Sequence, residues 1–323
     1  MSSPYSSFRI LNTEPGRLSS KARAALRELA IVDEIEADRK FILENIDKYN
    51  CLFIGIRNLI DKDILARAVK LQCIVTPTTG LNHIDIQVAT EKGVTVLSLR
   101  SETEFLSTVS ATAEFAWGML LALVRKIPAA HLNVMTGKWE RNQFYGNELR
   151  GQTIGIIGFG RLGRMLKTYA QAFGMRVLAY DINPVSEIDV EFIGLAELLE
   201  QSDVISVNLE LNEATKGMLG SREFSQMKKR AFLVNTARGE ILDEEAFLAS
   251  LKTGHLAGAA IDVMAAETSG NKNWLKESEL LEYARNHTNL LITPHIGGVT
   301  YESVEKTNNF IIEKLSKYLR DVT

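Results

Sequence analysis

Residues 153–164 read Thr-Ile-Gly-Ile-Ile-Gly-Phe-Gly-Arg-Leu-Gly-Arg, an apolar run that ends in the spacing Gly-x-Gly-x-x-Gly. The segment that follows, residues 165–173, has the composition of a helix. In this order Gly158 allows a tight turn, Gly160 lets the backbone approach a pyrophosphate, and Gly163 lets helix and strand pack closely. The helix N-terminus then offers unpaired N–H groups and a partial positive charge to phosphate groups.

The chain continues as a dinucleotide site requires. The next strand-like run, residues 176–180, ends in Asp181, close to the spacing of roughly 20 residues at which a carboxylate meets the adenosine ribose. The charge of Asp181 repels a 2′-phosphate, and no arginine follows in residues 182–184, so we expect NAD rather than NADP. Strand, glycines, helix, strand and acid in this order predict a dinucleotide-binding site rather than an ordinary surface turn.

Composition limits the classes of protein to consider. The 323 residues are 46% hydrophobic and 24% charged, enough for two ordinary globular cores. A net charge of −3 gives no reason to expect a nucleic acid or an anionic membrane as partner. Cys51 and Cys73 lie in apolar runs, which favours reduced core thiols over a disulfide or a metal site. The N-terminus lacks signal-peptide features, and the apolar stretch 115–124 is too short to cross a bilayer, so we expect a cytoplasmic protein.

Two separate α/β domains are predicted. Before residue 100, strand-like runs alternate with helical ones, which predicts a small parallel α/β sheet. Its strands are expected at residues 8–11, 51–56, 73–76 and 94–98, and its helices at 20–30 and 63–69. From residue 153 the same rhythm resumes, with further strands expected at 204–207, 231–234, 259–261 and 290–293. This second series predicts a doubly wound Rossmann domain.

Two further helices are predicted outside these two series. Residues 111–125 are apolar on most sides and end before Pro128, so we expect a buried helix. Residues 300–319 carry apolar side chains at helical spacing after the last strand, and we expect them to cross back to the first domain. The predicted boundaries are 1–103 with 296–323 for the smaller domain, and 104–295 for the dinucleotide-binding domain.

Three ionisable residues follow strands of the second domain, where open α/β sheets bind their ligands: Arg238, Glu267 and His295. An arginine can bind a substrate carboxylate through two parallel hydrogen bonds and polarise the neighbouring carbonyl. A histidine exchanges the hydroxyl proton as hydride moves, and a glutamate bonded to it orients the ring and favours its cationic form. Each residue alone would be taken for a solvated loop side chain, and His83 is the rival acid/base. Together, downstream of the glycines, they indicate hydride transfer.

Nearly the whole chain, and most strongly residues 151–298, resembles the D-isomer-specific 2-hydroxyacid dehydrogenases. The resemblance rests on Gly151–Gly160, on Asn-Thr-Ala-Arg-Gly at 235–239, on Gly-Ala-Ala-Ile-Asp-Val at 258–263, on Glu267, and on Pro-His-Ile-Gly-Gly at 294–298. It implies a flavodoxin-like α/β substrate domain beside the Rossmann domain, NAD as cofactor and a homodimer.

The resemblance also implies roles for individual residues. Arg238 would bind and polarise the substrate, and Glu267 with His295 would form the acid/base pair. Asp262 would face the nicotinamide carboxamide, while backbone N–H groups at Thr79 and Gly80 would hold the substrate carboxylate. The full set of implied cofactor contacts is Gly158, Gly160, Arg161, Leu162, Gly163, Asp181, Thr236 and Asp262.

This sequence departs from the family pattern at several positions. Thr268 replaces a proline after the glutamate, and the stretch 268–289 is longer than usual. Asn208 and Glu210 replace a histidine and a proline beside the ribose site, and Asn82 replaces an aspartate of the substrate loop.

The resemblance is strongest to the phosphoglycerate-dehydrogenase-like branch, in which Arg57 would contact a substrate phosphate. A second arginine of that site is Thr76 here, so 3-phosphoglycerate is not favoured over an unphosphorylated 2-hydroxy acid. Two alternatives remain at this point. One is an NAD(H)-sensing corepressor-like binding protein, and the other is a Rossmann enzyme that oxidises formate or phosphite.

Overall fold

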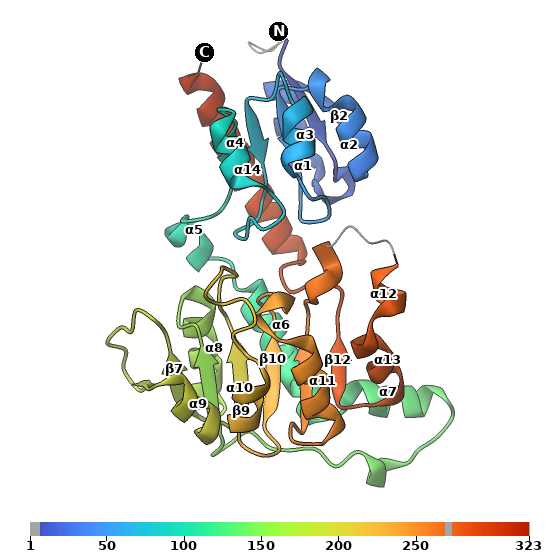
Figure 1. Ribbon diagram of the computed structural model, residues 1–323, viewed down its shortest axis with the longest axis vertical. Coiled ribbons are helices and arrows are strands. Elements are labelled where there is room, and N and C mark those ends of the chain that lie inside the picture. Colours follow the sequence, from blue (N-terminus) through green and yellow to red (C-terminus); the bar gives the residue numbers. More distant parts are fainter. Residues whose placement is uncertain (1–6, 269–272, 323) are drawn as a thin grey trace. The chain divides into compact units, whose positions relative to one another are not determined.

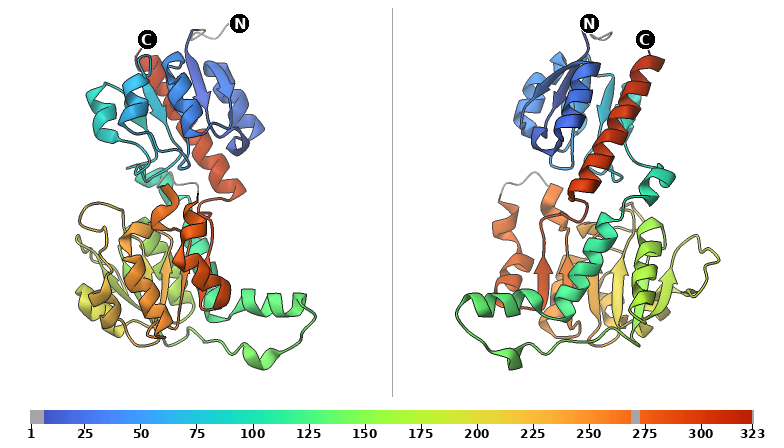
Figure 2. Two further views of the ribbon diagram at one scale, coloured as in Figure 1. Left: turned by 45° about the vertical axis from the view of Figure 1, so that its right-hand side comes forward. Right: turned by 180° about the vertical axis from the view of Figure 1, so that it is seen from behind.

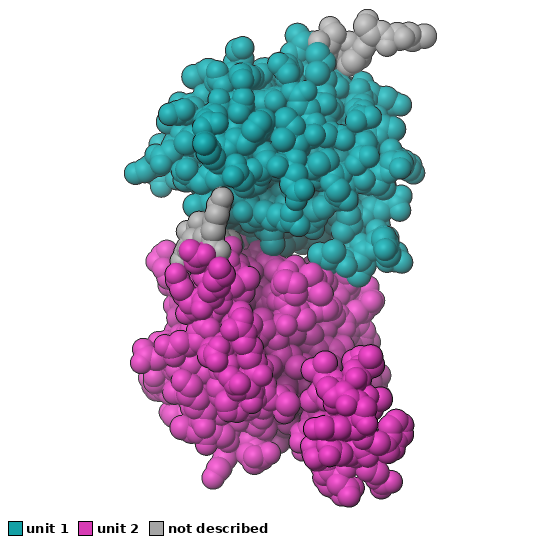
Figure 3. Space-filling model, turned by 90° about the vertical axis from the view of Figure 1, so that its right-hand side faces the viewer, with its two compact units in different colours: residues 1–108, 299–323 teal, residues 109–298 magenta. Residues whose placement is uncertain are grey.

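The computed structural model describes residues 7–268 and 273–322. The chain forms two compact units, one of residues 1–108 with 299–323 and the other of residues 109–298 (Figure 3). The prediction placed these breaks at 103/104 and 295/296, a few residues earlier in each case. Each unit has its own sheet and its own cores, and the units are described in turn (Figure 1).

Unit 1 is built on a five-stranded sheet of order β2-β1-β3-β4-β5, and all of its strand pairs are parallel. Its strands are β1 (Arg9–Asn12), β2 (Ile31–Glu34), β3 (Cys51–Phe53), β4 (Cys73–Val75) and β5 (Thr95–Leu97). Four of them were predicted from their apolar runs. The edge strand β2 was not, because its sequence Ile-Val-Asp-Glu is half charged and none of its side chains is fully buried.

Helices cover both faces of this sheet. One face packs against α1 (Ser20–Leu29), α5 (Thr103–Ser107) and α14 (Tyr301–Asp321), and the other against α2 (Arg39–Asn45), α3 (Lys62–Arg67) and α4 (Ile86–Glu91). Several of these helices begin where a Ser, Asp or Thr side chain caps the first turn, namely Ser19, Asp38, Asp61, Asp85 and Thr300. The last helix lies against α1, which confirms the prediction that the C-terminal segment joins the N-terminal domain (Figure 2).

Unit 2 contains a seven-stranded parallel sheet of order β12-β11-β10-β9-β6-β7-β8. Its strands are β6 (Thr153–Ile157), β7 (Arg176–Tyr180), β8 (Glu191–Phe192), β9 (Val204–Val207), β10 (Phe232–Asn235), β11 (Gly258–Ile261) and β12 (Leu290–Ile292). The order reverses between β6 and β9, so the glycine-rich loop after β6 stands at the switch point where doubly wound sheets bind dinucleotides. The predicted Rossmann architecture is confirmed, and only the two-residue edge strand β8 was missed.

The faces of the second sheet carry separate cores. One face packs against α6 (Ala111–Val124) and α8 (Arg161–Ala172). The other packs against α9 (Leu195–Gln201), α10 (Ser221–Gln226), α11 (Glu244–Lys252) and α13 (Glu279–Asn286). Both α7 (Ile127–Met135) and the single turn α12 (Trp274–Glu277) also belong to this unit. Because both faces are covered, the strands are buried on both sides and read as continuous apolar runs.

The stretch Thr103–Val124 is long and apolar enough to span a bilayer by length and composition, with a mean hydropathy of 1.3 and half of its window buried. It is longer than residues 115–124, on which the expectation from sequence rested, because α5 precedes α6. What marks α6 as a core helix is its packing: Trp117, Leu120 and Leu123 are buried in the core of unit 2.

Candidate active site

Glu267 and His295 meet at the carboxyl edge of the unit 2 sheet. Glu267 lies in a single 3₁₀ turn (Ala265–Thr268) that follows β11, and His295 follows the neighbouring strand β12. The Nδ1 atom of His295 lies 2.8 Å from Oε1 of Glu267, and the two side chains are 23% and 17% exposed. Because the carboxylate engages Nδ1, the ring presents Nε2 as the atom that can exchange a proton with a ligand.

Arg238 is held by the residue that ends β10. The side chain of Asn235 accepts a hydrogen bond from Ala237 N at 3.0 Å and donates one to Arg238 O at 2.9 Å. The guanidinium of Arg238 donates to Ala237 O at 2.6 Å. Burial lowers the pKa of Arg238, while the Glu267 carboxylate opposes that shift, and the group stays cationic because arginine titrates far above neutral pH. Glu267 thus interacts with Arg238 through its charge and contacts the ring of His295 directly.

Gly239 lets the Arg238 turn pack directly on the Glu267 turn. A Cβ atom built on Gly239 would lie 2.2 Å from Ala265 N and 2.2 Å from Met264 C. Real Cβ atoms do not approach backbone atoms so closely, so only glycine fits here without a backbone shift. The spacing between the cationic and acidic members of the site therefore depends on a residue that carries no side chain.

The three glycines of the loop after β6 have distinct surroundings. Gly158 has φ +88°, and its Cβ would lie 2.7 Å from Asn208 O, while a Cβ on Gly163 would lie 2.6 Å from Gly158 O. The protein's own packing therefore requires glycine at both positions. Gly160, the N-cap of α8, has no heavy atom within 4 Å of a Cβ position. The space at Gly160 and the first-turn N–H groups of α8 fit a pyrophosphate.

Asp181, the predicted ribose ligand, lies against the glycine-rich loop. Its Oδ2 accepts a hydrogen bond from Phe159 N in the glycine loop at 2.8 Å, and its Oδ1 accepts from Asn183 N at 2.9 Å. Each carboxylate oxygen keeps a further lone pair for a ribose hydroxyl. The carboxylate therefore fits an NAD ribose and also fixes the loop that approaches the pyrophosphate.

The remaining predicted cofactor residues belong to the same unit. The guanidinium of Arg161 donates to Val109 O, and its burial lowers its pKa. Leu162 packs against the core formed by α6 and α8, and Thr236 is buried just before the Arg238 turn. The Arg161 guanidinium and the Leu162 side chain thus contact other parts of unit 2.

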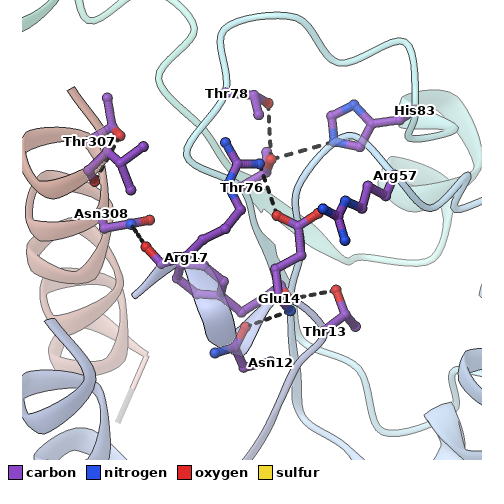
Figure 4. Close-up of polar contacts among 12 residues, drawn as sticks. Asn12, Thr13, Glu14, Arg17, Arg57, Thr76, Thr78, His83, Thr307 and Asn308 are labelled. Carbon is purple, nitrogen blue, oxygen red and sulfur yellow. Dashed lines mark hydrogen bonds and ion pairs between the residues drawn. The ribbon is translucent and has the colours of Figure 1, made fainter. Parts of the chain in front are cut away.

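The predicted substrate loop, with Thr79 and Gly80, follows β4 in unit 1 and is tied down by a chain of side chains (Figure 4). Thr78 Oγ1 donates to Gly80 O at 2.9 Å, Thr76 and Thr78 hydroxyls lie 3.0 Å apart, and His83 Nε2 lies 3.4 Å from Thr76 Oγ1. Since each hydroxyl has one proton, Nε2 of His83 is the donor in this chain. His83 is 2% exposed and supports the loop, so its structural role accounts for the residue that rivalled His295.

Two arginines near this edge of unit 1, Arg57 and Arg17, have carboxylate partners. Arg57, the predicted phosphate ligand, is exposed and donates to Glu36 at 3.1 Å. Arg17 donates to Glu14 at 2.9 Å (Figure 4). The Glu14 carboxylate packs on Gly55, where an added Cβ atom would lie 2.2 Å from Glu14 Oε2. The Glu14 carboxylate is therefore a second acid near Arg57, because it packs on Gly55, two residues before Arg57 in the sequence.

The roles of some residues that build the site were not predicted from the sequence. Asn235 clamps the Arg238 turn, and Glu244 accepts a hydrogen bond from Ala265 N at 3.0 Å, close to Glu267. Thr293 bonds the Asp262 carboxylate. For Asn235 and Thr293 the available signal was a polar residue at the last position of a strand or directly after it. Within the long stretch 268–289, residues 269–272 lie outside the described residues.

The chain was compared with known proteins. Residues 117–297 match the family described as D-isomer specific 2-hydroxyacid dehydrogenase, NAD binding domain. The glyoxylate reductase of Thermococcus litoralis is 33% identical over 293 residues, which cover 87% of this chain and 84% of that protein. The hydroxypyruvate reductase of Thermotoga maritima is 33% identical over 294 residues, which cover 90% of this chain and 92% of that protein.

A longer relative and a solved structure are also similar to this chain. The human D-3-phosphoglycerate dehydrogenase is 34% identical over 279 residues, 85% of this chain and 50% of that protein. The D-lactate dehydrogenase of Aquifex aeolicus, solved with NAD and lactic acid, matches with a TM-score of 0.84 at 26% identity, over 97% of this chain and 96% of that chain. The chain therefore belongs to the D-isomer specific 2-hydroxyacid dehydrogenases and is an NAD-dependent oxidoreductase that interconverts a 2-hydroxy acid and its 2-oxo acid.

Proposed function

We propose that this enzyme reduces a small 2-oxo acid without a phosphate group, of the glyoxylate or hydroxypyruvate type, to the D-2-hydroxy acid. The observation that carries the chemistry is the 2.8 Å contact between His295 and Glu267, beside the half-buried cation of Arg238. NADH, when bound, supplies the hydride. Arg238 binds the substrate carboxylate and polarises the carbonyl, and His295 donates the proton from Nε2 to the oxygen that becomes the hydroxyl.

The pairing of Arg57 supports an unphosphorylated substrate. A phosphate dianion is bound best by cations that have no carboxylate beside them, and Arg57 lies 3.1 Å from Glu36 in an exposed ion pair. The neighbouring guanidinium of Arg17 is paired with Glu14, and Thr76 offers a neutral hydroxyl. Two relatives, of whose length this chain spans 84% and 92%, carry the names glyoxylate reductase and hydroxypyruvate reductase, which fits the same class of substrate.

A substrate panel tests this proposal. The rate of NADH oxidation would be measured with glyoxylate, hydroxypyruvate, pyruvate and 3-phosphohydroxypyruvate, and the reverse reaction with the D and L forms of glycerate. We expect the highest kcat/KM with an unphosphorylated acid and oxidation of the D form alone. A preference for 3-phosphohydroxypyruvate would overturn the substrate class. The corepressor-like alternative is not favoured by the relatives, and it would require NADH binding without turnover of any acid.

Replacing Asp181 with alanine tests the cofactor site. Removing its charge takes away the repulsion of a 2′-phosphate, so the ratio of kcat/KM for NADPH to that for NADH should rise by about tenfold or more. Steady-state kinetics with both cofactors would measure the ratio. Glu200→Ala, on the exposed side of α9, is the matched control and should leave the ratio unchanged. An unchanged ratio in Asp181→Ala would remove Asp181 from the ribose site.

The homodimer is also a proposal. Residues of α7 and the segment after it expose large apolar side chains: Ile127, Leu132, Val134, Met135, Trp139 and Tyr145. Figure 2 shows this green segment extending away from the sheet of unit 2. Apolar groups gathered on a projecting segment mark a protein-binding surface. We take its occupant to be a second copy of the chain, and sedimentation should give twice the chain mass of 36.0 kDa.

A cytoplasmic location is proposed on the state of the two cysteines. Cys51 and Cys73 are paired in register on β3 and β4, yet both thiols are free and fully buried. Burial raises the pKa of the Cys51 thiol well above its ordinary value, so little reactive thiolate forms. This state suits a reducing compartment.

A further inference from the structure

The turn that carries His295 has a backbone conformation that must be held in place. His295 has φ +54°, in the left-handed region that residues other than glycine rarely adopt. Such a conformation persists only where surrounding contacts determine it. Its purpose at this position is geometric, because the backbone sets the direction in which the imidazole leaves the turn.

Asp262, at the end of the neighbouring strand β11, supplies those contacts. Its backbone oxygen accepts a hydrogen bond from His295 N at 2.9 Å. Its carboxylate oxygen Oδ1 accepts from Ile296 N at 2.9 Å and from the Thr293 hydroxyl at 2.6 Å, and Oδ2 accepts from Gly297 N at 2.7 Å. One residue thus forms hydrogen bonds with Thr293, with His295 itself, and with the two residues that follow it.

The carboxylate is suited to this task in charge and in shape. Every partner of its two oxygens is a donor, so a carboxylate accepts from all three, whereas an amide would turn an NH₂ group toward one of them. Asp262 is 1% exposed, so the lost hydrogen bonds could not be replaced by bulk water. A Cβ on Gly297 would lie 3.0 Å from Oδ2, which shows how closely the turn packs on the carboxylate.

We propose that Asp262 is a positioning residue that acts on hydride transfer through the backbone of His295, whether or not it also contacts the nicotinamide carboxamide. Thr293 is the second member of this arrangement, because its hydroxyl fixes Oδ1. The inference rests on the proposed role of His295 as acid/base. It separates two functions of one buried carboxylate, one directed at the cofactor and one at the catalytic turn.

A cycle that combines protein variants with a cofactor variant tests the proposal. Asp262→Asn and Thr293→Val would be assayed with NADH and with its 3-acetylpyridine analogue, which lacks the carboxamide N–H donors. We expect Asp262→Asn to lower kcat by up to about 10²-fold and by the same factor with both cofactors, since a misplaced catalytic group carries that cost. Thr293→Val should lower kcat in the same direction but less, with the KM for NADH unchanged.

Hydrogen exchange of the free protein gives a readout that does not depend on turnover. In Asp262→Asn and in Thr293→Val, the amides of Ile296 and Gly297 should exchange faster than in the wild type. Thr253→Val, which removes a hydroxyl that donates to Ala249 O at the end of α11, is the matched control and should leave both amides and kcat unchanged.

Two results would overturn the proposal. One is a kcat loss in Asp262→Asn with NADH that disappears with the acetylpyridine analogue, which would assign Asp262 to the cofactor alone. The other is unchanged exchange at Ile296 and Gly297 in both variants. If Asp262→Asn fails to fold, Thr293→Val decides the matter by itself. Failure of the proposed function would look different, because the exchange result would stand while the wild-type protein reduced no 2-oxo acid.

Discussion

His295→Ala is expected to lower kcat about 10²- to 10⁴-fold, the range contributed by general acid–base catalysis. The variant loses the group that donates a proton to the forming hydroxyl. Glu267 contacts the Nδ1 side of the ring and not the Nε2 side that faces the ligand, so we do not expect it to replace His295. NADH binding should persist, because the glycine loop and Asp181 make no contact with His295 in the hydrogen bonds described above. Stopped-flow or steady-state reduction and a fluorescence titration of NADH would measure the two effects separately.

The control for this variant is His287→Ala, which removes an exposed ring that stacks on Tyr283 in α13 and should leave kcat unchanged. Full activity in His295→Ala would move the acid/base role to another residue. His83 would be examined next, although its burial and its bond to Thr76 favour a supporting role in the loop.

Gly239→Ala should be the most damaging change that removes no functional group. A methyl group at this position meets the backbone of Met264 and Ala265 at 2.2 Å, so the Arg238 turn and the Glu267 turn must separate. A displacement of about 1 Å at a catalytic group costs on the order of 10² in rate, and we expect kcat/KM to fall by about that factor. The measurement is kcat/KM for the preferred 2-oxo acid, together with the melting temperature and NADH affinity.

Gly194→Ala is the matched control, since a Cβ on Gly194 meets no atom within 4 Å and its φ of −64° suits any residue. It should retain wild-type kcat/KM. If Gly239→Ala kept full activity and stability, the close packing of the two turns would have no bearing on catalysis. A loss of melting temperature with unchanged kcat/KM would likewise assign Gly239 to folding rather than to the site.

Most of the fold was predictable because its signals are local. Buried parallel strands read as apolar runs, and all but β2 and β8 were found in this way. Both missed strands lie at sheet edges, where one side is open and the apolar pattern is weak, as in Ile-Val-Asp-Glu of β2. The reversal of strand order between β6 and β9 followed from the glycine-rich turn and the fold class that it predicts.

The candidate site was only partly predictable. Arg238, Glu267 and His295 could be named because each follows a strand, and parallel strands end at one edge. Their roles as acid/base pair and substrate fork stay predictions until the variants are measured. Asp262 shows the limit: it was assigned to the nicotinamide on resemblance, and nothing local in the sequence indicates its bonds to residues 293–297.

Local chemistry in the amino-acid order was sufficient to specify the glycine turn, the acid after β7 and the polar residues at strand ends, because these depend on neighbours along the chain. Three features depended on the folded chain: the contact between Glu267 and His295, the packing of Gly239 on Met264 and Ala265, and the hold of Asp262 on the His295 turn. Each joins segments that are separate in sequence. They meet because β10, β11 and β12 pair in parallel and in register, and that pairing is a property of the whole sheet.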